Sequence, residues 1–313
     1  MPPSTRRSDG HQRRCRGLRR RQAERDWADG LPVDALLEIL RRLDHVDVLI
    51  SACAVCRSWR HVGRDEPSLW RRISLLGSGR GWASLGSGRC AMAFTAVHRS
   101  VGQCEVFCGR DAGNNAFLHY LSEQAPCLKS LRLISCRRIT NRGLKAAVKK
   151  LPQLEELEIS LCDNIRGSTM FKVVGKACPQ LKRFRLSKEC FSFSYIDKRK
   201  LNWDANGIAN MHELNSLQLF GNRLTNKGLE TILDNCPKLE SLDIRHCFNV
   251  NMDKALLTKC AGIRTLRLPN DPTDYNLQVK SPRRPTRGTR FWERSSSESD
   301  WNTDVSDSED SDF

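Results

Sequence analysis

One phrase recurs between Pro126 and Leu268 and constrains the fold more than any other feature of the chain. Its copies share a Leu-x-x-Leu-x-Leu pattern, and four of them read PCLKSLRLISC (126–136), PQLEELEISLC (152–162), PQLKRFRLSKEC (179–190) and PKLESLDIRHC (237–247). Successive copies lie 24 to 33 residues apart, with their first Leu or Ile at Leu128, Leu154, Leu181, Leu214, Leu239 and Ile263. A period of this length is typical of a solenoid, in which each unit buries its apolar face against its neighbours.

Each copy predicts a short strand followed by a helix. In the first copy Leu131 and Leu133 flank Arg132, which predicts a strand with two side chains pointing inward and one outward. The next residues, ITNRGL, place Thr140 as a helix cap ahead of an apolar pattern with helical spacing that begins at Leu144. The Pro that opens the following copy ends the helix.

These units resemble the cysteine-containing subtype of leucine-rich repeats. Six are predicted, and a degenerate unit at about 101–125 would use Cys104 and Phe107 in place of Leu. The unit between Leu186 and Leu214 lacks the Thr-x-x-Gly-Leu helix start and carries extra aromatic residues at Phe191, Phe193, Tyr195 and Trp203. Two interpretations stay open for these aromatic residues: core positions of a divergent repeat, or a loop that stands off the array and contributes to binding.

A second informative segment lies upstream, at 27–73. Pro32 precedes apolar residues with helical spacing (Leu36, Ile39, Leu40 and Leu43), which predicts a short amphipathic helix. A second helix is expected from about 47 to 62, and a third element ends in PSLW at 67–70. The order LP…LL.IL..L…VCR.W…LW resembles the F-box from Leu31 to Trp70, and in particular the F-box of plant proteins that also carry leucine-rich repeats.

The predicted fold class is therefore α+β and multidomain: a small all-α three-helix F-box followed by a short α/β leucine-rich-repeat horseshoe, with disordered termini. We expect a basic arm at 1–25, the F-box at 26–73, a Gly/Ser-rich linker at 74–98, the repeats at 99–270 and a tail at 271–313. The linker is indicated by the pentapeptide LGSGR, which occurs twice but lacks the strand-then-helix context that a phosphate-binding loop requires.

The resemblance implies a function in ubiquitin transfer. An F-box docks on a Skp-family adaptor, which connects it to the cullin and RING subunits of a ubiquitin ligase, and the repeats select a protein substrate. By position in the motif, the implied adaptor contacts are Leu31, Pro32, Leu36, Leu40, Val55, Cys56, Trp59, Leu69 and Trp70. Several of these residues could instead hold the three helices together. Because the sequence carries no motif of a catalytic site, the chain is expected to be a non-catalytic receptor without a cofactor.

The outward-facing residues of the strands form a candidate substrate face. One column reads Arg132, Glu158, Arg185, Gln218, Asp243 and Arg267. Neighbouring strands lie about 4.8 Å apart, so Glu158 is expected to pair with both Arg132 and Arg185, and Asp243 with Arg267. A column of alternating sign disfavours a simple polyanion and favours a patterned protein surface as the partner. It is an equally good interpretation that these pairs only neutralise one another.

Part of the formal net charge of +16 lies in segments that are poor in apolar residues. Residues 1–25 carry a net charge of +7, residues 278–294 carry +5 and residues 295–313 carry −7, and such segments are expected to be disordered. The Arg-rich arm could act as a nuclear import signal or touch RNA non-specifically, although nucleic acid is an unlikely partner for the whole chain. Ser295, Ser297 and Ser306 stand three residues before an acid, which suits acidophilic kinases.

The 14 Cys residues are expected to be reduced thiols. The sequence shows neither a signal-peptide pattern nor an apolar run that approaches the ~20 residues of a membrane span, so the expected location is the nucleus or cytoplasm, or both. Cys136, Cys162 and Cys247 follow their strands at one offset and are expected to fill buried positions. Cys53-x-x-Cys56 resembles half a zinc site, but no second pair follows at a usable spacing, so no metal is expected.

Two functions from different classes remain. The first is the substrate receptor of a Skp–cullin–F-box ubiquitin ligase. The second is a leucine-rich-repeat adaptor, or a basic nuclear binding protein, in which the F-box-like helices serve only as packing. Co-purification with a Skp-family adaptor distinguishes the two.

Overall fold

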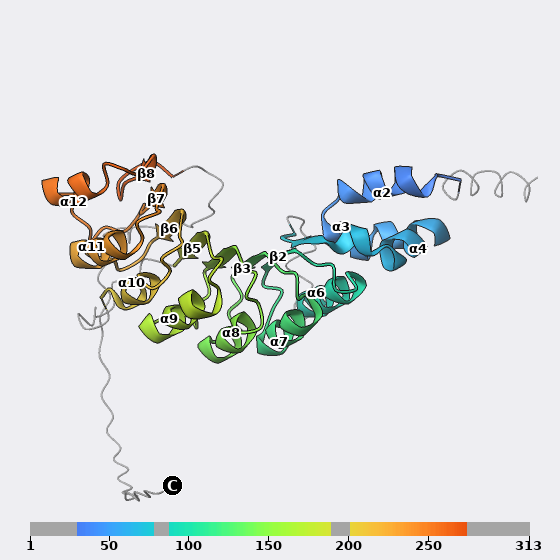
Figure 1. Cartoon of the computed structure of the whole chain (residues 1–313). Helices are drawn as coiled ribbons and strands as arrows, with labels where there is room; N and C mark the ends of the chain where they lie inside the picture. Colours follow the sequence, from blue (N-terminus) through green and yellow to red (C-terminus); the bar gives the residue numbers. More distant parts are fainter. Residues whose placement is uncertain (1–29, 78–87, 189–200, 274–313) are drawn as a thin grey trace, which may run out of the picture. The chain divides into compact units, whose positions relative to one another are not determined.

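The computed structural model of the protein describes residues 30–77, 88–188 and 201–273 (Figure 1). Four sequence predictions therefore lie outside the described residues. They are the disorder of 1–25, the disorder of all but the first three residues of 271–313, the flexibility of 78–87, and the place of Phe191, Phe193 and Tyr195.

A helical module precedes the repeats. It contains α2 (Val33–Arg41), α3 (His45–Ile50), the 3-10 turn η1 (Ala52–Ala54), α4 (Arg57–Asp65) and the 3-10 turn η2 (Pro67–Trp70). The single second helix expected from about 47 to 62 is wrong, because the chain bends twice there. Asp44 caps α3 by accepting a hydrogen bond from the Val46 amide at 2.9 Å, and Cys56 adopts an extended backbone that starts α4 anew.

Strands and helices then alternate through the repeats (Figure 1). Within the described residues eight parallel strands pair in sequence order: β1 (Arg72–Leu75), β2 (Val106–Arg110), β3 (Ser130–Ile134), β4 (Glu156–Ser160), β5 (Arg183–Ser187), β6 (Ser216–Phe220), β7 (Ser241–Asp243) and β8 (Thr265–Arg267). The helices are α6 (Gly88–Arg99), α7 (Asn115–Gln124), α8 (Asn141–Val148), α9 (Ser168–Ala177), α10 (Trp203–Ile208), α11 (Asn226–Asn235) and α12 (Lys254–Lys259).

The range expected to be a linker, 74–98, belongs largely to the repeat fold. β1 buries Ile73 and Leu75 and pairs with β2, and α6 buries Ala93, Ala96 and Val97. The linker prediction is therefore wrong for these two elements, and the array begins before residue 99. The four residues of β1 carry no Leu-x-x-Leu-x-Leu phrase, and the small residues of α6 form only a weak apolar pattern, so neither element has a strong sequence signal.

The core of the repeats follows the sequence pattern closely. The degenerate unit is confirmed, because β2 forms there and Cys104 and Phe107 are fully buried. Cys136, Cys162 and Cys247 are buried as predicted, and the thiol of Cys162 donates to the Leu133 carbonyl on the preceding strand, with 3.5 Å between the atoms. Trp203 opens α10 and is 45% exposed, which rules out the core interpretation for this aromatic residue.

The helical module and the first repeat share buried contacts around Trp70. The indole of Trp70 donates to the Gly63 carbonyl at 3.1 Å, and Arg99 of α6 donates to the same oxygen at 3.1 Å. The guanidinium of Arg99 also lies over the Trp70 ring, 5.2 Å from its centroid. His45 completes this junction by bonding the Leu69 carbonyl through Nε2 and accepting from the Ser74 amide through Nδ1.

Candidate protein-binding surfaces

The residues predicted to contact an adaptor divide into two groups. Leu36, Leu40, Leu69 and Trp70 are at most 3% exposed and form the core of the helical module, so they are unavailable to a partner in this conformation. Leu31, Cys56 and Trp59 are partly buried, whereas Pro32 and Val55 are exposed. The sequence motif therefore identified the module correctly, but four of its nine proposed contact residues hold the helices together.

An additional set of exposed apolar side chains lies on the same module, and the sequence reasoning missed most of it. These side chains are 36–55% exposed and lie on α2, on α3, just after α2 and just after η1: Val33, Ile39, Leu43, Ile50 and Val55. We call them the exposed apolar set. A signal was present, because α2 carries apolar residues at Val33 and Ile39 in addition to its buried residues Leu36, Leu37 and Leu40.

The residues of the candidate substrate column are strand partners in the predicted order. Arg132, Glu158 and Arg185 are direct partners on β3, β4 and β5, and the column continues through Gln218, Asp243 and Arg267. Glu158 Oε2 lies 2.6 Å from Arg132 Nε and 3.2 Å from Arg185 Nη1, as predicted. The carboxylate is not at the surface, however: Glu158 is 5% exposed, and its other oxygen accepts from the Ser160 hydroxyl at 2.8 Å.

A second row of side chains runs beside this column: Ser130, Glu156, Arg183, Ser216, Ser241 and Thr265. Here Glu156 accepts from the Ser130 hydroxyl at 2.9 Å and pairs with Arg183 at 3.6 Å. On β6, β7 and β8 the residues of this row carry hydroxyl groups instead of charges. Charged partners are thus concentrated at the N-terminal end of this row.

Asp243 has a partner that the sequence reasoning missed. Arg245, two residues beyond it, donates from Nε to Oδ1 at 3.0 Å and from Nη2 to Oδ2 at 2.7 Å. Only 6% of the Arg245 side chain is exposed, and its Nη1 also donates to the Pro272 carbonyl at 3.1 Å. The register places Asp243 beside Arg267, as expected, and the fork of Arg245 also contacts both carboxylate oxygens of Asp243.

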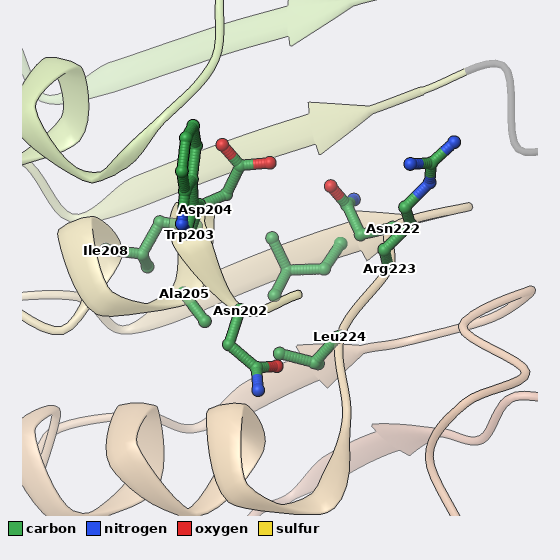
Figure 2. A pocket seen from close by; sticks show the side chains of 9 residues that line it. Asn202, Trp203, Asp204, Ala205, Ile208, Asn222, Arg223 and Leu224 are labelled. Carbon is green, nitrogen blue, oxygen red and sulfur yellow. The ribbon is translucent and has the colours of Figure 1, made fainter. Parts of the chain in front are cut away.

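Two hollows lie in the repeat region, one on the strand face and one beside α10. One is a groove of about 280 Å³ over β5 to β8, lined by residues of both rows together with Arg245. The other, shown in Figure 2, lies beside α10 and the segment after β6 and is lined by Trp203, Asp204, Asn222 and their neighbours. Its volume of about 20 Å³ holds roughly one water, which is too small for a peptide or cofactor.

The polar residues at the small hollow stabilise the fold. Asn202 accepts from the Thr225 amide at 2.9 Å and thereby supports the start of α11. Asp204 accepts from the Gly167 amide at 2.7 Å and also pairs with Lys188. These bonds connect α10 to the starts of α9 and α11 on either side, so the polar residues at the hollow already have structural partners.

Neither a metal centre nor a membrane-spanning helix is found among the described residues. Within 30–77, 88–188 and 201–273, no three His, Cys, Asp or Glu side chains gather as a metal site would require. In the same residues, the helices are too short or too polar to span a bilayer.

Comparisons with known proteins agree with both parts of this architecture. An F-box-like family model matches residues 28–76, and a Leucine Rich repeat model matches residues 210–233. F-box protein SKIP19 of Arabidopsis thaliana is 39% identical over 79% of this chain and 78% of its own length. The chain belongs to the F-box/leucine-rich-repeat family.

Other relatives extend the same result. F-box/LRR-repeat protein 22 of Arabidopsis thaliana is 38% identical over 82% of this chain and 81% of its own length. F-box/LRR-repeat protein 23 of the same plant is 39% identical over 80% of this chain, which spans 55% of that relative's length. A solved chain described as the crystal structure of the Rad7 and Elc1 complex in yeast is 12% identical and covers 82% of this chain and 64% of its own. Its TM-score of 0.37 is too low to support an argument.

Membership of the family defines the helical module at 30–70 as the F-box and the following array as leucine-rich repeats. F-box/leucine-rich-repeat proteins are generally non-catalytic adaptors, typically receptors of Skp–cullin–F-box ligases, and an F-box implies an adaptor of the Skp type. The two surfaces described above therefore have distinct candidate partners.

Proposed function

We propose that this protein is the substrate-recognition subunit of a Skp–cullin–F-box ubiquitin ligase. Its F-box docks on a Skp-family adaptor, which connects it to cullin and RING subunits, and its strand face selects a protein substrate. The chain itself contributes no catalytic residue in this proposal. The observation that carries it is the exposed apolar set on an F-box whose own core is already complete.

The energetics of the exposed apolar set support a docking role. The core of the F-box is filled by Leu36, Leu40 and Trp70, so the five exposed side chains are not needed to close it. Burying what remains exposed of five such side chains contributes on the order of 5 kcal/mol before the costs of association. Five large apolar side chains left exposed on one small module are available to a protein partner.

The strand face supports the second half of the proposal. Its two rows present charged and hydroxyl side chains in a fixed register, and neighbouring strands hold them by hydrogen bonds. A surface of this kind selects partners by matched charge more than by apolar area. It is therefore suited to a protein substrate, in contrast to the apolar F-box side chains.

Adaptor capture tests the proposal. The full chain is co-expressed with a Skp-family adaptor and purified through a tag on the chain, and adaptor recovery is measured for the wild type, Ile50→Asp and Val55→Asp. We expect both variants to lose the adaptor while keeping the wild-type melting temperature. Val101→Asp is the matched control, because Val101 is a 71% exposed Val outside the F-box. Failure of the wild type to recover adaptor would favour the alternative of a leucine-rich-repeat adaptor without a ligase role.

We further propose that the protein acts in the nucleus or the cytoplasm. The cysteines of the described residues are free thiols, which is the state that a reducing compartment maintains. Imaging of a fluorescent fusion in plant cells tests this proposal, and accumulation in the secretory pathway would contradict it.

A further inference from the structure

Two neighbouring helices of the repeats carry cations and no acids. α8 and α9 pack against each other in the helix layer of the array (Figure 1). Neither helix contains an Asp or Glu residue. Five basic residues lie on these helices and at the residue that follows α8, and all are exposed except the partly buried Lys145. We call them the basic helix patch: Arg142, Lys145, Lys149, Lys172 and Lys176.

The cations of the patch recur at equivalent positions of the two repeats. Leu144 of α8 and Phe171 of α9 are buried at the same position of successive units, 27 residues apart. The same offset relates the Lys residues of the two helices, Lys145 to Lys172 and Lys149 to Lys176. Neighbouring helices lie about 8–10 Å apart and positions i and i+4 about 6 Å apart, so these four positions form a grid of roughly 6 by 10 Å.

Elsewhere in the helix layer, a cation pairs with an acid on the neighbouring helix. Lys150, directly after α8, pairs with Glu123 of α7 at 3.0 Å, and Lys259 of α12 pairs with Asp234 of α11 at 2.6 Å. Between α8 and α9 such an acid is missing. Within the part of the chain that the structure describes, none of the five side chains of the patch forms an ion pair or a side-chain hydrogen bond. Because neighbouring like charges repel, an anionic ligand would relieve this arrangement.

The composition of the patch favours a phosphate backbone over a protein or a membrane. Protein interfaces are depleted of Lys and use aromatic or Arg anchors. Helices that bind membranes insert Trp, Phe or Leu. Among the described residues, no large apolar side chain is exposed on α8 or α9. Contacts to phosphates need only cations and carry no sequence information, which matches a surface of this kind.

A double helix fits the patch better than a single strand. Proteins that bind single strands stack the bases on aromatic side chains. Phe171, the aromatic residue of α8 and α9, is fully buried and unavailable for stacking. A duplex carries one charge per about 1.7 Å of its axis, so a length of about 10 Å presents about six phosphates to the five cations. The strand face, where charges alternate, does not match a polyanion, so the two surfaces are distinct.

We propose that the basic helix patch binds the phosphate backbone of double-helical nucleic acid without reading its sequence. This activity goes beyond the ligase role and does not depend on it, because neither the F-box nor the strand rows take part. DNA and RNA duplexes share the phosphate chemistry, and a comparison of the two identifies which one the protein binds.

Duplex binding at several salt concentrations tests the inference. The full chain is titrated into fluorescein-labelled DNA or RNA duplexes of about 20 base pairs, and anisotropy gives Kd between about 50 and 200 mM salt. We expect a Kd of about 1–100 μM at physiological salt and a logarithm of affinity that falls linearly with the logarithm of salt concentration. Duplexes of two unrelated sequences should bind equally, because the contacts go to phosphates.

Neutral variants locate the binding. Lys172→Gln combined with Lys176→Gln removes two phosphate contacts, so it should reduce the salt slope by about 2 and weaken binding by about tenfold or more. Lys227→Gln combined with Lys254→Gln is the matched control, because it removes two exposed Lys residues from α11 and α12 and should leave the slope unchanged. The basic terminal segments are identical in all variants, so the difference reports the patch alone. Melting temperatures establish that each variant is folded.

Several outcomes would overturn the inference. They are the absence of duplex binding by the wild type, an equal loss in the two double variants, and tighter binding of a single strand with the same number of phosphates. Displacement of the duplex by polyglutamate or by phosphatidylserine vesicles at matched charge would assign the patch to an acidic protein or to a membrane surface. Adaptor capture without duplex binding would sink this inference alone, whereas duplex binding without adaptor capture would overturn only the ligase role.

Discussion

The carboxylate of Glu158 on β4 lies between Arg132 on β3 and Arg185 on β5, and its Oε2 is 2.6 Å from Nε of Arg132. The same oxygen accepts from Arg185 at 3.2 Å, and the Ser160 hydroxyl donates to Oε1 at 2.8 Å. Because only 5% of Glu158 is exposed, this single anion compensates two guanidinium groups from a position that water hardly reaches. Glu158 therefore ties β3, β4 and β5 together below the surface that a substrate would touch.

Replacing Glu158 should be costly to stability. Glu158→Arg would place three cations in one column, and removing one partner of a buried ion pair typically costs about 3–5 kcal/mol. We expect a value of about 3 kcal/mol, because the two Arg side chains are 33% and 40% exposed and are partly screened by solvent. Urea unfolding of the purified chain measures the free-energy difference.

Glu155→Arg is the control for this measurement. Glu155 pairs with Lys182 at 3.5 Å, but its side chain is 37% exposed and that of Lys182 is 52% exposed. The same substitution at this neighbouring position should therefore cost less than about 1 kcal/mol. Similar losses for Glu155→Arg and Glu158→Arg would show that burial does not distinguish the two carboxylates.

This column illustrates what the sequence could predict and what it could not. The strand period of two and the spacing of the Leu phrase were enough to place Arg132, Glu158 and Arg185 in one register. Burial of Glu158 was not predictable, because it depends on how two long Arg side chains cover the carboxylate. Arg245 was missed for a related reason: it lies beyond β7 and reaches back to Asp243.

The F-box likewise has features that its sequence predicts and features that it does not. The motif identified the module, yet α2 carries more apolar residues than its core contact uses, and the motif does not say which of them face the core. The structure buries Leu36 and Leu40 and exposes Val33 and Ile39, whereas the sequence reasoning assigned the first pair to the adaptor. Tertiary packing of α2 against α4 and η2 decides this choice, and no local pattern encodes it.

Two adjacent residues of α2 test that assignment. Leu40 is fully buried and Ile39 is 38% exposed. Leu40→Ala should destabilise the protein by about 2–5 kcal/mol through the cavity that it leaves, and Ile39→Ala by well under half of that amount. Thermal unfolding of both variants makes the comparison. A larger loss for Ile39→Ala would mean that the buried stripe of α2 has been assigned wrongly.

The junction between the F-box and β1 should depend on pH through His45. Burial lowers the pKa of His45 below its ordinary value, since desolvation outweighs the Leu69 carbonyl and the Asp44 charge, which raise it. The neutral ring donates from Nε2 to Leu69 and accepts at Nδ1 from the Ser74 amide, and protonation would remove that acceptor. The unfolded chain then binds a proton that the folded chain resists, so stability falls as pH drops below about 6.5.

Melting temperatures of the wild type and His45→Gln between pH 7.5 and 5 measure this effect. Gln can both donate and accept but does not titrate, so the variant should lose part of the pH dependence. Because other His and carboxyl groups are common to both proteins, the difference between the two curves isolates His45. Parallel curves for the two proteins would contradict the prediction.

Val101 occupies a backbone conformation that favours other residues. Its φ is 45° and its side chain is 71% exposed, in the turn between α6 and β2. The left-handed region costs an ordinary L-residue about 1–2 kcal/mol, and Asn tolerates it better than a β-branched residue does. Val101→Asn should therefore raise stability by about 1 kcal/mol in urea unfolding. Val33→Asn, at an exposed helical position, should give no such gain. An equal gain at both positions would show that the positive φ of Val101 is not the cause.

Burial should also control the reactivity of the cysteines. Desolvation raises the pKa of Cys104 and of Cys178 to about 12, so at pH 8 only about one thiol in ten thousand is ionised at these positions. Cys127 is exposed and accessible to reagent. Brief alkylation of the folded protein, followed by peptide mass spectrometry, should label Cys127 and leave Cys104 and Cys178 unmodified. In guanidinium all three thiols should react at similar rates, because unfolding removes the protection. If Cys104 of the folded protein were labelled at the same rate as Cys127, the first repeat would open readily and its core would not be closed as described.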